Sequence, residues 1–223
     1  MLEATSPHDR RFYSAMALLL VLLAGAGFAP TFYARGWFTD AAPLPLAIQV
    51  HGAVGTAWVL LFAIQSGLMA LRRVQWHRRV GVVGAMLSVA FVLSGAVVIA
   101  NLEQGHVGES RATLAAHVFT NVVPLVAFAL FAGAAIGQRS VPARHKRLML
   151  LAAVVLMPPA IGRLLGHLDL SRLNLLAYAC VAFANALYDT LTRGRPHAVS
   201  LLGATTLVAI DVVTTTWLAA VGS

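Results

Sequence analysis

The sequence predicts an all-α, polytopic membrane bundle of seven transmembrane helices. Its 223 residues are 59% hydrophobic and only 11% charged, whereas about a quarter of the residues in a soluble domain are charged. The mean hydropathy is +0.80. The apolar residues fall into seven segments, and nearly all charges lie between them. We therefore expect residues 1–223 to form a single transmembrane domain.

Each apolar segment has the length of a membrane span. A spanning helix needs about 20 residues, and the expected helices cover residues 12–30, 47–71, 80–100, 113–137, 147–166, 173–191 and 198–220. The first segment follows Arg10 and Arg11 like the apolar part of a signal peptide, but its length favours a retained helix. Pro158 and Pro159 interrupt the fifth segment, which should be the least regular helix.

The cations predict the orientation, because Lys and Arg concentrate in cytoplasmic loops. With the N-terminus inside, the inner segments hold 12 of the 16 cations, and the outer segments hold only Arg35, Arg111, Arg163 and Arg172. We expect an N-in/C-out protein of the bacterial inner membrane. The pI of about 11.0 then reflects orientation, so the lipid bilayer is the expected partner and nucleic acid is not.

A histidine pattern occurs twice along the chain. His51 and His77 lie 26 residues apart, and His117 and His145 lie 28 residues apart. These spacings place one histidine of each copy near each membrane face. Residues 47–100 and 113–166 are therefore expected to be two tandem hairpin repeats that form a four-helix core. The other three helices would flank this core.

The histidines form two candidate ligand pairs. His51 with His117 at the outer face, and His77 with His145 at the inner face, could each hold a haem b iron, and the outer pair could hold a transition metal. We expect the outer pair to be the better buried and stronger candidate, because basic residues around the inner pair also serve as helix anchors. Small residues beside His77 could admit a macrocycle or serve only helix packing without a cofactor.

Four further polar residues interrupt the apolar segments: Gln65, Arg163, Asp189 and Asp211. Gln65 falls on the helix stripe of His51. Asp189 could orient a histidine, although an ion pair with Arg193 one turn later is the favoured interpretation. Asp211 lies deep in the last segment and needs a cation or a proton, for which Arg163 is the candidate partner.

The four histidines and the hairpin arrangement of residues 47–166 resemble transmembrane b-type cytochromes of the cytochrome b561 kind. This resemblance implies two haems, one near each face, held by His51 and His117 and by His77 and His145. A second resemblance covers most of the chain and is to small bacterial seven-helix membrane proteins without an assigned function. It rests on Gly27–Tyr33, His77–Gly81, His145–Leu150, Tyr188-Asp189 and Gly194–His197.

Three functions stay open at this point, and only some of them are enzymatic. The leading hypothesis is a haem protein that moves electrons or senses redox state across the inner membrane, with a respiratory or redox protein as partner. The second is a metal-dependent membrane enzyme with ligands from the outer histidines and the outer-loop residues Glu103, His106, Glu109, His167 and Asp169. The third is a non-catalytic protein, such as a respiratory-complex assembly factor or a carrier.

Overall fold

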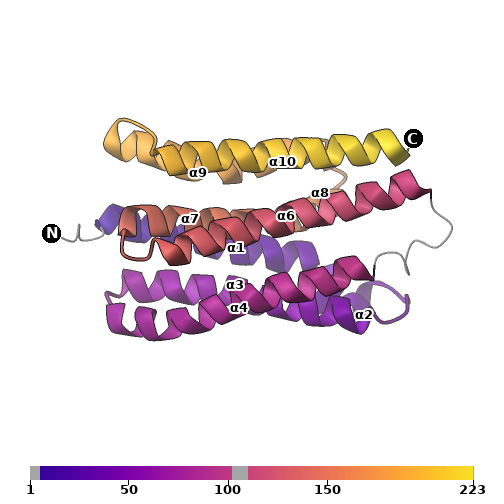
Figure 1. Cartoon of the computed structure of the whole chain (residues 1–223), viewed down its shortest axis with the longest axis horizontal. Coiled ribbons are helices and arrows are strands. Elements are labelled where there is room, and N and C mark those ends of the chain that lie inside the picture. Colours follow the sequence, from indigo (N-terminus) through magenta and orange to yellow (C-terminus); the bar gives the residue numbers. More distant parts are fainter. Residues whose placement is uncertain (1–5, 102–109, 223) are drawn as a thin grey trace.

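The computed structural model describes residues 6–101 and 110–222, which form an elongated bundle of helices (Figure 1). The chain is 86% helical, and the described residues include no strand. Six helices are long and apolar enough to cross a membrane, and one bent pair adds a seventh if it forms a single span. The expected class, an all-helical bundle of the multi-pass membrane type, is confirmed.

The helices follow the expected apolar segments in order. The first is α1 (Pro7–Phe28), which continues through a π-helical turn, η1 (Ala29–Tyr33), into the short α2 (Arg35–Phe38). The others are α3 (Leu46–Ala70), α4 (Val74–Ala100), α6 (Arg111–Gly137), α7 (Pro142–Val154), α8 (Pro158–His167), η2 (Ser171–Leu173), α9 (Asn174–Arg193) and α10 (Ala198–Gly222).

Local residue chemistry explains where several helices begin and end. The Ser6 hydroxyl accepts a hydrogen bond from the Asp9 amide at 3.0 Å, and Pro7 occupies the first turn, so α1 begins five residues before the apolar segment. Ser110 caps α6 in the same way. Gly194 ends α9 with a φ of +76°, a left-handed conformation that favours glycine.

The fifth segment is broken, as the two prolines predict. α7 ends at Val154 and α8 begins at Pro158, with a bend of 43° between them. Val155 and Met157 in the break are almost fully buried. Neighbouring helices therefore surround the irregular backbone, which is the condition under which a broken helix is tolerated inside a membrane.

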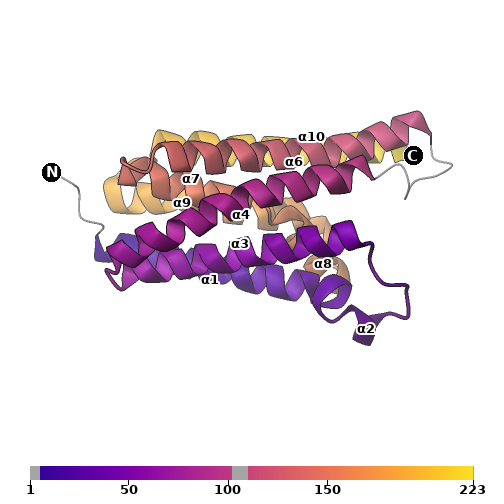
Figure 2. The ribbon, with the colours of Figure 1, turned by 60° about the horizontal axis from the view of Figure 1, so that its bottom comes forward.

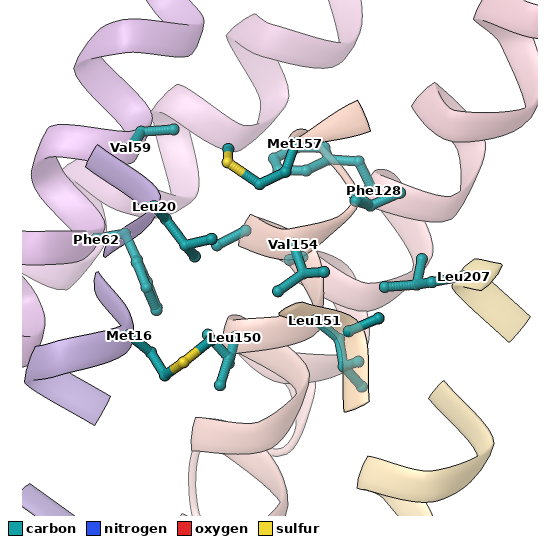
Figure 3. Packing of buried hydrophobic residues seen from close by; sticks show 14 of the residues in the cluster. Met16, Leu20, Val59, Phe62, Phe128, Leu150, Leu151, Val154, Met157 and Leu207 are labelled. Carbon is teal, nitrogen blue, oxygen red and sulfur yellow. The ribbon is translucent and has the colours of Figure 1, made fainter. Parts of the chain in front are cut away.

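The broken helix also forms the centre of the hydrophobic core. Leu150, Leu151, Val154 and Met157 from this segment are each at most 1% exposed. Figure 3 shows them between side chains of α1 and α3 on one side and Phe128 of α6 and Leu207 of α10 on the other. The α9–α10 pair covers the side of the bundle away from α3 and α4 (Figures 1 and 2).

The first helix is part of the inner bundle, which differs from the expected flanking position. α3, α4, α6 and α7 pack one against the next, while α1 packs against α3, α7 and α8. The approach of α1 to α8 is close because Gly27 faces the backbone of Ala160, where a Cβ atom would collide. Gly203 of α10 similarly makes room for Leu151 of α7.

Candidate functional site

The two inner histidines face each other across the bundle. His77 lies in the first turn of α4 and His145 in the first turn of α7, so both occupy the same end of the molecule. Their ring centroids are 6.3 Å apart, and the ring planes are inclined by 80°. The structure therefore brings together His77 and His145, which the sequence analysis paired because both were expected near the inner membrane face.

Hydrogen bonds hold both inner imidazoles in place. His145 Nδ1 lies 2.8 Å from the carbonyl oxygen of Ala135, so this nitrogen carries the proton and donates it. His77 Nδ1 lies against the side-chain amide of Gln65, whose nitrogen donates to it when the amide oxygen accepts from the Gly81 amide at 2.9 Å. Gln65 therefore serves His77 of α4, although its stripe position suggested His51.

His77 and His145 would be the residues that hold a metal atom at the inner end. Two imidazoles that each bind one metal atom through a bond of about 2.0 Å, with about 1 Å from nitrogen to ring centre, would have centroids up to about 6 Å apart. The observed 6.3 Å matches this separation. The tautomer of His145 already leaves Nε2 free to ligate. Ligation through His77 Nε2 would require the proton on Nδ1, whereas the hydrogen-bonded orientation of the Gln65 amide donates to Nδ1.

The glycines beside His77 are not required by helix packing. A Cβ atom on Gly81 would meet only the Gln65 amide, at 4.0 Å, and one on Gly84 would meet Leu61 at 3.5 Å, an ordinary contact. Both positions could carry alanine without moving a neighbour. These two glycines are therefore not close-packing positions, and their role beside His77 stays a prediction.

The surroundings of the outer histidine His51 are filled. Its ring stacks on that of Phe91, with 4.4 Å between the ring centroids. Its Nδ1 lies 3.0 Å from the Ser94 hydroxyl. A Cβ atom on the neighbouring Gly95 would come within 3.1 Å of the His51 ring and 2.8 Å of Leu125. A macrocycle on His51 would have to displace these side chains, so the residues present do not fit a haem there. His117 lies half-buried in the second turn of α6.

An aromatic layer separates the two histidine levels. Phe128 of α6 makes edge-to-face contacts with two rings. Its ring centroid lies 5.0 Å from that of Trp58 of α3 and 4.8 Å from that of Phe91 of α4. The Trp58 indole donates to the Ser88 hydroxyl at 2.7 Å, and Ser88 donates to the Gly84 carbonyl at 2.8 Å. The rings fill the space between the helices and their polar atoms are paired, so this layer is packed core.

A buried ion pair joins α7 to the last two helices. Arg147 donates to both carboxylate oxygens of Asp189, and both side chains are 0% exposed. The Ser200 hydroxyl of α10 donates to the same carboxylate at 2.6 Å. The expected partner Arg193 lies farther away, with 3.8 Å between the nearest charged atoms. Asp189 is therefore chiefly the counter-ion of Arg147.

A second ionic cluster surrounds Asp9 at the same end. Its carboxylate accepts from Lys146 and from the Tyr188 hydroxyl, each at 2.8 Å, and lies 3.4 Å from Arg193. Asp9 precedes the first apolar segment, and its partners lie 137 and more residues away. The sequence carried one signal for it, an acidic residue in an otherwise basic inner region.

Among the residues that the structure describes, the outer and central polar side chains form no metal site. The Arg163 guanidinium lies over the Phe28 ring at 4.9 Å and donates to the Pro159 carbonyl, and no ion pair joins it to Asp211. Glu103, His106 and Glu109 lie outside the described residues. In the described ranges, no group of three or more His, Cys, Asp or Glu side chains is placed to hold a metal ion.

Comparison with known proteins adds no relative. The chain matches no protein-family model, no curated protein and no solved structure. Both resemblances drawn from the sequence therefore stay predictions.

Proposed function

We propose that this protein is a multi-pass membrane haem protein that exchanges electrons through an iron held between His77 and His145. The observation that carries the proposal is the 6.3 Å separation of two imidazoles that come from different helices. Two axial histidines are sufficient to hold haem b, so a third protein ligand is not needed. Ligation by His51 and His117 stays a prediction of the sequence, and the packing around His51 does not favour it.

The residues around the inner pair have distinct roles in this proposal. The Ala135 carbonyl holds the His145 ring in the ligating tautomer. For His77 to ligate in the same way, the Gln65 amide would have to give up its bonds to the Gly81 amide and the His77 carbonyl and present its oxygen to Nδ1. Arg78 and Arg144, next to the two histidines in sequence and exposed, are placed to pair with the acidic edge of a bound haem. Haem supplies one-electron chemistry when bound, and the chain supplies ligands and electrostatics.

We further propose that the chain crosses the bacterial inner membrane seven times, N-in/C-out, with α7 and α8 as one bent span. The excess of Lys and Arg in the 71–79, 138–147 and 193–195 regions supports this orientation. The iron would then lie near the cytoplasmic face, where a respiratory or redox protein could exchange electrons with it. The two hairpins, residues 47–100 and 113–166, stay a proposed repeat.

An absorption spectrum of the purified full-length protein tests the proposal. After expression with adequate haem supply, we expect a Soret band and a bis-histidine pattern of reduced α and β bands. His77→Ala and His145→Ala should each abolish both features, whereas His51→Ala should keep them. Protein without a Soret band, or a band that survives both inner substitutions, would refute this assignment.

One observation favours a second candidate, a non-catalytic membrane protein. With the Gln65 amide nitrogen facing His77 Nδ1, His77 carries its proton on Nε2, while His145 presents an unprotonated Nε2. The two rings are then in an edge-to-face contact, with 6.3 Å between their centroids, that packs α4 against α7 without a metal. In that case the purified protein contains no stoichiometric haem, iron, zinc or copper, and His77→Ala lowers thermal stability without changing any spectrum.

A further inference from the structure

An open cavity of about 540 Å³ lies beside η1, α2 and α3. This volume lies within the range of small-molecule sites. Figure 1 shows α2 at the end of the bundle opposite the first turns of α4 and α7, where the inner histidines lie. The cavity adjoins η1, α2, the segment before α3 and the first turns of α3. Most of its wall is apolar, and its lining consists of Phe32, Arg35, Pro43, Leu44, Leu46, Gln49, Val50 and Ala53.

Arg35 is the cationic member of this lining, and its guanidinium is tethered. One terminal nitrogen, Nη2, donates to the carbonyl oxygen of Ala42 at 3.3 Å. Its Nε is buried and has no hydrogen-bond partner within residues 6–101 and 110–222. A guanidinium that only anchors a helix extends freely toward water. Arg35 instead lines an apolar cavity, where its guanidinium could donate hydrogen bonds to an anionic group.

The neighbouring residues place this cavity at the level of lipid headgroups. Trp37 and Phe38 of α2 are 90% and 65% exposed, and aromatic residues concentrate at the boundary between headgroups and hydrocarbon. The Gln49 amide donates to the Leu44 carbonyl at 2.6 Å and thereby fixes the loop that closes one side. Arg35 is also one of only four cations in the proposed outer segments, so orientation does not explain its presence.

We propose that this cavity binds an acidic phospholipid of the outer leaflet. The headgroup phosphate would accept hydrogen bonds from Arg35, and an acyl chain would lie along the apolar wall that includes Leu46 and Val50. Arginine forms strong, directional hydrogen bonds to phosphate, and membrane proteins bind acidic lipids at such basic pockets. The site rests on the proposed orientation but does not depend on the haem.

Lipid retention measured by native mass spectrometry tests this site. The full chain in detergent is titrated with phosphatidylglycerol and, separately, with phosphatidylcholine. We expect the wild-type protein to retain phosphatidylglycerol preferentially, and Arg35→Gln to weaken its binding about tenfold, as for one charge-assisted hydrogen bond. Arg172→Gln removes another exposed cation of the outer segments and should leave binding unchanged. Lipid held at the inner arginines is common to both variants and cancels in the comparison.

A second variant keeps the test decisive if Arg35→Gln fails to fold. Ala53→Phe fills the apolar part of the cavity, leaves Arg35 in place and should cause a similar loss of phosphatidylglycerol. Equal retention by wild type, Arg35→Gln and Ala53→Phe would overturn the proposal. Complete displacement of the lipid by millimolar inorganic phosphate would also overturn it, because the cavity would then be an ion site. The absorption spectrum should be unchanged in both variants, which separates this result from the test of the haem.

Discussion

Gln65 shows how much one side chain can decide at the inner pair. Its amide contacts His77 Nδ1, and which of its two ends faces the ring selects the nitrogen of His77 that carries the proton. With the oxygen toward His77, both histidines present Nε2 and can hold iron. With the nitrogen toward His77, the proton of His77 lies on Nε2, and the two rings form an edge-to-face contact without a metal. Gln65 is thus a positioning residue for the proposed site.

Gln65→Glu should lower the reduction potential of a bound haem and keep the Soret band. A carboxylate at this position accepts Nδ1–H of His77 and makes the imidazole a stronger donor to the oxidised iron. Spectroelectrochemical titration measures the shift. Gln75→Glu adds the same charge at an exposed position of α4 and should change the potential much less. Equal shifts in both variants would mean that Gln65 acts only through its added charge.

The Arg147–Asp189 pair should contribute strongly to stability because neither side chain is exposed. Asp189→Asn leaves the Arg147 charge buried without a counter-ion, a change that costs about 3–5 kcal/mol in buried pairs. We expect a marked fall in the unfolding midpoint in detergent. Asp40→Asn, at an exposed position, is the control. A small effect of Asp189→Asn, equal to that of the control, would show that Arg147 finds another partner.

At the scale of elements, helix contacts depend on small residues at particular positions. Gly27 lets α1 meet the backbone of Ala160 at the start of α8, while Gly25, half a turn away, has no atom within 4 Å of a Cβ position. The two glycines lie in the same helix and differ in what they face. Their sequence context is nearly the same, so the structure alone separates their roles.

Gly27→Ala should destabilise the bundle by about 1–3 kcal/mol, because the added methyl group overpacks the contact between α1 and α8. Gly25→Ala should be neutral or stabilising by up to about 1 kcal/mol, since alanine favours a helix over glycine. Thermal unfolding of the two variants side by side measures the difference. If both variants behave alike, the close approach of α1 and α8 is wrong.

The start of α10 should be sensitive to pH. His197 Nδ1 accepts from the Val199 amide at 3.1 Å, which requires an unprotonated nitrogen. Burial and the nearby Arg147 and Arg193 hold the pKa of His197 below its ordinary value of 6.5. The unfolded chain therefore binds this proton more readily, and the stabilising contribution is complete above about pH 6.5 and declines as the pH falls below it.

His197→Asn should reduce this pH dependence, because asparagine caps a helix without titrating. The unfolding midpoint of each protein is compared at pH 8 and pH 5. We expect the wild type to lose more stability than the variant between these values. Identical losses would show that other histidines account for the whole dependence.

For the whole molecule, the main question is whether the bent α7–α8 pair is one span. If it crosses the membrane, residues 138–141 and 168–170 lie on opposite sides. If it turns back, they lie on the same side, and the chain has six spans. The backbone of the buried break at residues 155–157 allows both a single span and a segment that turns back. The distribution of Lys and Arg favours the single span.

Reporter fusions distinguish these arrangements. Alkaline phosphatase, which is active only outside the cytoplasm, should be inactive when fused after Arg139 and active when fused after Asp169. A fluorescent protein that matures in the cytoplasm should give the opposite pattern, and fusion after Arg73, in the loop between α3 and α4, is the inside control because it lies inside in both arrangements. Equal phosphatase activity at Arg139 and Asp169 would refute the seven-span topology.

Hydropathy predicted the helices well because it depends only on local composition. The break at Pro158 and the common depth of His77 and His145 followed from proline chemistry and helix length. The partners of Gln65 and Arg147 could not be predicted in this way. The helices are apolar around most of their circumference, so the sequence does not indicate which face meets which neighbour. Rotation about each helix axis is settled by packing, including the glycine contacts.

The Arg147–Asp189 pair also has a consequence for how the chain is made. Asp189 is synthesised 42 residues after Arg147. Until α9 and α10 follow, α7 carries an uncompensated charge and an apolar surface that its final neighbours have not yet covered. We therefore expect α7, the central helix, to reach its final packing only after the α9–α10 hairpin has been synthesised and packs against it. Ribosome-bound intermediates that end before α9 should hold α7 loosely and expose it to proteolysis.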